Sequence, residues 1–215
     1  MKIKCLIFTC FILICPPLLC QTPIEEDIPL TEDLMKEHGL LNRVLLIYDK
    51  VISMKDIPIE PLKKAVAIIE SFIENYHEKN EENYIFPLFE KANIKVELVR
   101  TLKAQHIKGR EVTAAIKKII YQSTPITTKN KKRVRSLLKK FINMYRPHEA
   151  REDTELYPLV RSLMSKKDFD ELSEKFEDSE HELFGPHGFE DFLKKVEDIE
   201  KELGIYQLAQ FTPKL

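Results

Sequence analysis

The chain has 215 residues and is 43% hydrophobic, enough for one full core and one domain. Its 34 basic and 35 acidic side chains nearly cancel, so there is no basic excess to indicate nucleic acid as a partner, and no acidic tail. Only 5 glycines are present, and Lys, Glu, Leu and Ile dominate. These residues favour helices over short strands, so we predict an all-α protein.

The N-terminal segment differs from the rest of the chain. Lys2 and Lys4 precede an apolar run over residues 5–20, which predicts a secretory signal over 1–20 and therefore an exported protein, periplasmic or secreted. Pro16 and Pro17 argue against a helix that spans the membrane. Lipid attachment at Cys20 is an alternative, and if 1–20 is no signal the protein is cytoplasmic. Membrane association is expected only through this segment, if it is retained.

The cysteines restrict the chemistry of any metal site. All four lie in the first 20 residues, at Cys5, Cys10, Cys15 and Cys20. The folded body therefore has no disulfide framework and no thiolate ligands. A metal would have to bind nitrogen and oxygen atoms.

After a linker over residues 21–30, the first helix is predicted to start near Thr31 as N-cap, with Glu32 and Asp33 in its first turn. Apolar residues recur every three or four positions along it, and a histidine falls within this buried stripe. The stripe consists of Leu34, His38, Leu41, Leu45, Tyr48 and Ile52.

The second helix is predicted to begin at Pro58 and Pro61, with the inward positions Leu62, Val66, Ile69, Ile73, His77, Glu81 and Tyr84. The third covers about residues 94–122, with Leu102, His106, Thr113, Ile116 and Ile120 inward, and ends at Thr124-Pro125. The fourth starts near Thr128 and turns Val134, Leu138, Phe141, Tyr145, His148 and Glu152 inward.

These four helices, joined by short connections, predict an antiparallel up-down-up-down four-helix bundle over residues 31–163. A C-terminal helical extension over 164–215 follows, with helices near 166–184 and 189–203 divided by Gly185-Pro186. The extension must pack outside the bundle or cap one end.

An internal repeat carries the functional prediction. Residues 77–88 (HEKNEENYIFPL) match residues 148–159 (HEAREDTELYPL) with identical His, Glu, Glu, Pro and Leu. In each copy, a histidine and a glutamate four residues apart point from one face of a helix to the same place. Each copy also has one histidine on the preceding helix. Six donors are therefore expected to meet: His38, His77, Glu81, His106, His148 and Glu152.

Four imidazoles with two carboxylates are typical of a pair of first-row transition metals. We expect two non-haem iron ions, with manganese or zinc as the alternative. One structural zinc ion needs only four ligands, and calcium or magnesium would not select imidazoles. Histidines that are merely hydrogen-bonded in the core are the simpler interpretation, but burying six such groups without a cation would cost several kcal/mol each.

The same residues resemble the hemerythrin-like (HHE cation-binding) family over about residues 30–160. The similarity lies in Glu37-His38, Gln105-His106-x-x-Gly109-Arg110, and the two HxxxE segments that end in Phe86-Pro87 and Tyr157-Pro158. It implies a non-haem di-iron centre with the four histidines as terminal ligands and Glu81 and Glu152 as bridges. Dioxygen, nitric oxide or peroxide would be its small-molecule partners.

The sequence departs from the oxygen-carrying members of that family at two positions. Arg110 stands where those members have a further histidine, and Asp153, where they have the bridging aspartate, stands beside Glu152. Simple oxygen transport is therefore in doubt. We expect a protein that binds or senses oxygen, iron or a small reactive molecule rather than an enzyme. The alternatives are a di-iron oxidase, peroxidase-like or nitric-oxide-handling enzyme, or a structural bundle stabilised by metal.

The sequence also predicts roles for glutamate, tyrosine and histidine side chains other than the six donors. Glu78 and Glu149 should point about 100° away from the ligands, as supporting or surface groups, with Glu78 as a possible third carboxylate. The four tyrosines near the site should pack in the core with each hydroxyl finding a partner, and the alternative is a hydrogen bond to a metal-bound oxygen species. They are Tyr76, Tyr84, Tyr145 and Tyr157. His181 and His187 should be turn or interface residues, unless one of them supplies the missing nitrogen ligand.

Overall fold

The computed structural model describes residues 29–122 and 125–214, and every regular element in these two ranges is a helix. The predicted all-α class is confirmed. The predicted signal segment, Cys20 and the Thr124 end of the third helix lie outside the described residues. Within the described part, no helix combines the length and hydrophobicity that crossing a membrane requires.

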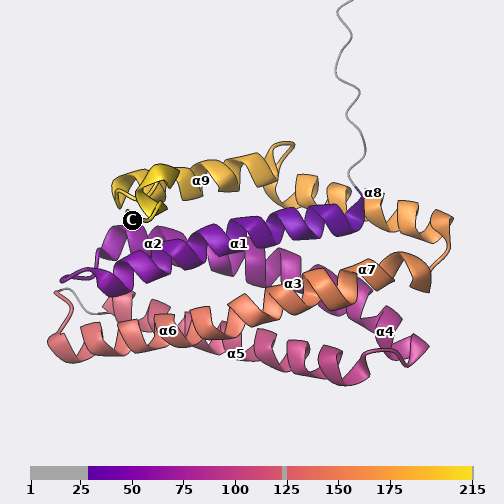
Figure 1. Cartoon of the computed structure of the whole chain (residues 1–215), viewed down its shortest axis with the longest axis horizontal. Helices are drawn as coiled ribbons and strands as arrows, with labels where there is room; N and C mark the ends of the chain where they lie inside the picture. Colours follow the sequence, from indigo (N-terminus) through magenta and orange to yellow (C-terminus); the bar gives the residue numbers. More distant parts are fainter. Residues whose placement is uncertain (1–28, 123–124, 215) are drawn as a thin grey trace, which may run out of the picture.

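Four long helical segments correspond to the four predicted ones (Figure 1). The first is α1 (Leu30–Ser53) and the third is α5 (Val96–Gln122). The second consists of α2 (Ile59–Ile68), η1 (Ile69–His77), α3 (Glu78–Asn80), η2 (Glu81–Ile85) and α4 (Phe86–Ala92). The fourth consists of α6 (Thr128–Arg151), η3 (Glu152–Leu156), α7 (Tyr157–Val160) and η4 (Arg161–Leu163).

Local chemistry explains where these segments begin and end. The carbonyl of Pro29 accepts hydrogen bonds from the backbone N–H groups of Glu32 and Asp33, so α1 starts at Leu30 and Thr31 is not its cap, contrary to our prediction. The Thr127 hydroxyl caps α6 by accepting from the Asn130 N–H. Asn93 ends α4 with a left-handed φ of 56°, a conformation that asparagine tolerates better than most residues.

The sequence analysis did not predict the π-helical segments η1, η2 and η3, of which η2 and η3 occur at the same place in the two repeats. The backbone N–H of Phe86 bonds to the carbonyl of Glu81, and that of Tyr157 bonds to Glu152, five residues back in each case. Pro87 and Pro158 come next. A proline ring clashes with the carbonyl four residues earlier, and a widened turn relieves this clash. Both repeats therefore widen directly after the predicted glutamate ligand.

The C-terminal extension contains α8 (Lys166–Phe184), α9 (Gly188–Glu202) and the short η5 (Leu208–Phe211). Helix α9 lies along α1 and α2 and buries Phe192, Val196 and Ile199 against them (Figure 1). As a result α1 is buried on two sides.

The sequence analysis predicted only one buried stripe on α1 and therefore missed its second buried side. Leu40, Val44 and Ile47 are fully buried outside that stripe, whereas Ile52, predicted to face inward, is only half-buried. Tyr84 of the second segment is likewise only half-buried.

The core consists of two hydrophobic clusters with a polar layer between them. One cluster contains Leu41, Ile73, Ile116 and Tyr145, and the other contains Leu34, Ile85, Leu102 and Leu156. On each of the four segments the predicted ligands lie between a residue of one cluster and a residue of the other. The polar layer is therefore closed off by apolar side chains on both sides.

Candidate metal centre

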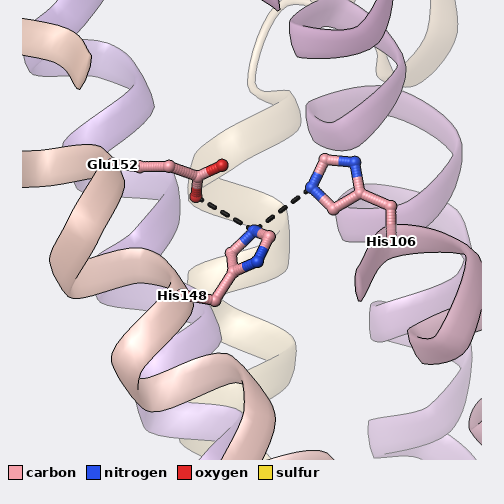
Figure 2. Close-up of side chains that lie close together, drawn as sticks. All are labelled: His106, His148 and Glu152. Atoms are coloured by element: carbon pink, nitrogen blue, oxygen red, sulfur yellow. Dashed lines mark hydrogen bonds and ion pairs between the residues drawn. The ribbon is translucent and has the colours of Figure 1, made fainter. Parts of the chain in front are cut away.

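The structure brings all six predicted donors together in the buried layer. The Nε2 atoms of His38 and His77 are 3.1 Å apart, and those of His106 and His148 are 3.2 Å apart. All six side chains are at most 4% exposed. Figure 2 shows three of them, with His106 of α5 facing His148 and Glu152 of the fourth segment.

Each glutamate connects the two histidine pairs. The Oε2 atom of Glu81 lies 3.5 Å from Nε2 of both His77 and His106. The Oε2 atom of Glu152 lies 3.4 Å from Nε2 of His38 and 3.1 Å from Nε2 of His148. Each carboxylate therefore contacts one histidine of each pair, as a bridging ligand would.

The outer nitrogen of every histidine has an oxygen partner. The Nδ1 atom of His38 bonds to Asp153 at 2.7 Å, and that of His77 bonds to Glu37 at 2.5 Å. The Nδ1 atom of His106 bonds to Glu82 at 3.1 Å, and that of His148 bonds to the Gln105 side-chain oxygen at 2.8 Å. Because these oxygens accept, Nδ1 carries the proton in all four rings.

In their neutral forms, all four rings therefore direct an Nε2 lone pair into the layer. Two lone pairs 3.1 or 3.2 Å apart repel each other unless a positive charge lies close to both. In addition, Oε2 of Glu81 and both carboxylate oxygens of Glu152 have no hydrogen-bond partner. Buried polar atoms without partners are rare and costly. This donor set fits cations bound between the four rings and the two carboxylates.

The ionisation of the cluster indicates the same need for positive charge. Burial raises the pKa of the Glu81 carboxyl well above its usual range, and the neighbouring Glu152 carboxylate raises it further. Burial lowers the pKa of His38, but the Asp153 carboxylate bonded to it and the nearby Glu152 carboxylate outweigh this effect and raise that pKa well above the usual range. Two carboxylates in one apolar enclosure are stable only with cations beside them.

A model of the Hemerythrin HHE cation binding domain matches residues 30–160 of this chain. The chain belongs to this family. It is 40% identical over 199 residues to the uncharacterized protein Mb2018 of Mycobacterium bovis, with 90% of this chain and 78% of the relative covered. The uncharacterized protein Rv1995 of Mycobacterium tuberculosis matches to the same extent. No solved structure gives a significant match.

In this hemerythrin-family chain, Glu152 rather than Asp153 faces the histidine pairs. The Asp153 carboxylate is turned to the outer nitrogen of His38 and is one-third exposed. Of these two neighbouring carboxylates, Glu152 is therefore the one that lies between the histidine pairs.

Glu78 and Glu149 point away from the centre, as predicted, but neither lies on the surface. The Glu78 carboxylate accepts from the Tyr145 hydroxyl at 2.5 Å and from the Arg110 guanidinium at 2.9 Å. The Glu149 carboxylate accepts from the Asn42 amide. Both glutamates are at most 2% exposed. They support the layer without entering it.

Gly109 and Arg110 of the family motif position this support. A Cβ atom at Gly109 would lie 1.9 Å from the Tyr145 hydroxyl, so only glycine lets the tyrosine reach Glu78. Arg110 binds both Glu78 and Glu82. The residue that replaces a histidine of the oxygen carriers therefore neutralises acidic groups beside the centre.

The four tyrosines near the candidate centre differ in what they contact. Among the described tyrosines, only Tyr157 forms hydrogen bonds with the six donors. Its hydroxyl donates to Oε1 of Glu81 at 2.9 Å and lies 3.4 Å from Nε2 of His38. Tyr76 donates to the backbone carbonyl of Phe176, and Lys175 lies over the Tyr84 ring. These two tyrosines pack away from the candidate centre.

His181 and His187 are exposed, in contrast to the buried donors. They therefore lie outside the buried layer, whose members are at most 4% exposed, and the structure does not place either of them as the missing nitrogen ligand. The sequence analysis also gave no role to the outer partners Glu37, Gln105 and Glu82. Glu37 and Gln105 each directly precede a ligand histidine, a signal that could have identified them.

Proposed function

We propose that the protein is a non-haem di-iron protein that binds or senses dioxygen or another small reactive molecule. Its centre would lie in an antiparallel four-helix bundle of the hemerythrin type. One ion would be held by His38 and His77 and the other by His106 and His148, with Glu81 and Glu152 as bridges. The observation that carries the proposal is the inward orientation of four histidine Nε2 atoms, in two close pairs, beside carboxylate oxygens that have no partner.

The charges balance with two divalent cations. Four carboxylates lie at the centre, those of Glu81, Glu152, Glu37 and Asp153. Burial raises the pKa of Glu37 and of Glu81 well above the usual range, so both would be ionised only with cations beside them, and two divalent ions would neutralise all four. Glu82 is paired with Arg110, and hydrogen bonds from His106 and Arg110 help to hold its pKa well below the usual range despite partial burial. One divalent ion would neutralise only two of these four charges.

The protein would supply each ion with two nitrogens and two oxygens, which leaves room for a small ligand on a metal that takes more than four. Iron bound there would supply redox chemistry toward dioxygen, nitric oxide or peroxide. The Tyr157 hydroxyl donates its proton to Oε1 of Glu81 and would thereby orient this carboxylate at the centre.

Metal analysis combined with an optical spectrum, recorded on anaerobically purified protein before and after exposure to air, tests the proposal. We expect two iron ions per chain and a spectrum that changes on oxidation. One ion per chain, or zinc with no spectral response, would refute the di-iron assignment. Multiple turnover of peroxide or nitric oxide would indicate an enzyme in place of a binding or sensing protein.

A further inference from the structure

The strongest charge asymmetry of the molecule lies outside the metal centre. Residues 112–148 contain no Asp or Glu, although the charges of the whole chain nearly cancel. The same stretch contains ten basic side chains, and most of them lie on α6. They are Lys117, Lys118, Lys129, Lys131, Lys132, Arg133, Arg135, Lys139, Lys140 and Arg146.

Some of these cations are already neutralised. Lys117 pairs with Glu70, Lys131 with Asp56, and Arg146 with Asp49. By contrast, Lys132, Lys139 and Lys140 are exposed and have no acidic partner within the described ranges. Charge therefore accumulates along one face of α6.

That face is hollowed into a groove of about 500 Å³ beside the C-terminal end of α1. Its polar lining comes from Lys132, Arg135, Ser136, Lys139, Lys140 and Asn143. These positions follow one another at helical spacing and extend over about 16 Å of α6, at 1.5 Å per residue. Cations, a hydroxyl and an amide thus form one line of hydrogen-bond donors.

Arg135 fixes the wall of the groove. Its guanidinium donates to the backbone carbonyls of Ile52, Met54 and Lys55, at 3.2, 2.7 and 2.8 Å. These bonds attach α6 to the end of α1 and keep a permanent positive charge in the lining. The groove is therefore held in shape without a ligand.

We propose that this groove binds a soluble anion that carries two or more linked phosphate groups. Positive side chains one helical turn apart match a row of phosphate groups, and Ser136 and Asn143 add neutral donors between them. The lining includes no aromatic side chain on which a nucleic-acid base could stack, and Ile52 is its one apolar residue. These features favour a short phosphate chain over single-stranded nucleic acid or a membrane surface.

Calorimetric titration of the metal-loaded full chain with inorganic tripolyphosphate tests the inference. We expect salt-sensitive binding that weakens about tenfold or more in the Lys139→Ala/Lys140→Ala double variant, because two phosphate-binding cations are lost. The matched control is Lys166→Ala/Lys167→Ala, which removes the same charge from exposed positions of α8 and should bind like the parent chain. Metal content measured before and after titration identifies heat that comes from chelation.

Three results would overturn the inference. The first is no binding by the parent chain. The second is an equal loss of affinity in the α8 control, which would show that binding depends only on the net charge of the protein. The third is tighter binding to phosphatidylglycerol vesicles or to DNA than to tripolyphosphate. Because Lys139 and Lys140 do not contact the six metal-binding candidates, none of these results depends on the identity of the metal.

Discussion

The two halves of the candidate centre share the same inward geometry of their histidines but differ in the hydrogen-bond partners of the outer ring nitrogens. On both sides a pair of imidazoles presents Nε2 atoms 3.1 or 3.2 Å apart. Outside, His38 and His77 bond to the carboxylates of Asp153 and Glu37. His148 bonds instead to the neutral amide of Gln105, and the partner of His106, Glu82, is shared with Arg110. The repeated helix pair preserves the inward geometry, whereas the surrounding helices give each half its own charge.

This comparison predicts that the His38–His77 half holds its ion more tightly, since an anionic partner makes an imidazole a stronger ligand. It also predicts that both halves are needed for the stability of the fold.

The largest effect is expected from removing one ligand in each half. His77→Ala and His148→Ala should each lose at least half of the bound metal, because one ion of two loses a terminal ligand. Both should unfold at lower temperature, since unpaired buried carboxylates cost about 3–5 kcal/mol. Metal analysis and thermal unfolding measure these changes. The exposed His181→Ala variant is the control, and metal content and melting equal to it would count against the ligand assignment.

An intermediate effect is expected from the outer partners. Glu37→Gln should weaken metal binding about 10–100-fold, because His77 loses its anionic partner. Gln105→Glu should leave binding equal or tighter, because it gives His148 the carboxylate partner that the other half has. Competition with a chelator measures both affinities. If the two substitutions change the metal affinity in the same direction and by the same amount, the hydrogen-bond partners of the outer histidine nitrogens do not distinguish the two halves.

The smallest effect concerns the glutamates that directly follow the two repeat histidines. Burial raises the pKa of Glu149 from 4.5 to about 8, so the folded chain holds this carboxyl protonated at neutral pH. A folded-state pKa above the unfolded value means that stability falls as pH rises from about 4.5 through about 8. Glu149→Gln should therefore match the parent chain at pH 5 and melt a few degrees higher above pH 8.

Glu78→Gln provides the comparison from the first half. The Glu78 side chain points to Tyr145 and Arg110, so the variant should retain its metal. Metal loss would show that Glu78 is a ligand. A Glu149→Gln variant that melts like the parent chain at every pH would show that the Glu149 carboxyl is not buried in the neutral form.

Much of the fold and of the candidate site followed from spacing along the chain. His77 and Glu81, four residues apart, must share a helix face, and His148 and Glu152 repeat that relation. His38 and His106 could be assigned because each interrupts a regular apolar stripe. The two helices of the extension were also predicted within one residue of their observed bounds.

Spacing alone could not reveal contacts between distant segments. The second buried face of α1 exists because α9, more than 130 residues later, packs against it. The choice between Glu152 and Asp153 depends on where His38 and His148 lie around the widened turn of η3. The π-helical turns themselves require knowing how the chain relieves the clash at Pro87 and Pro158.

By itself, the sequence determined which six side chains could meet, because the helical period fixes which residues of one helix share a face. Only the tertiary structure decided what lies behind each histidine. Glu37, Asp153, Glu82 and Gln105 reach their partners from other segments of the chain. Such pairings depend on how whole helices pack, and the free energy of that packing is a property of the assembled core rather than of any local stretch of sequence.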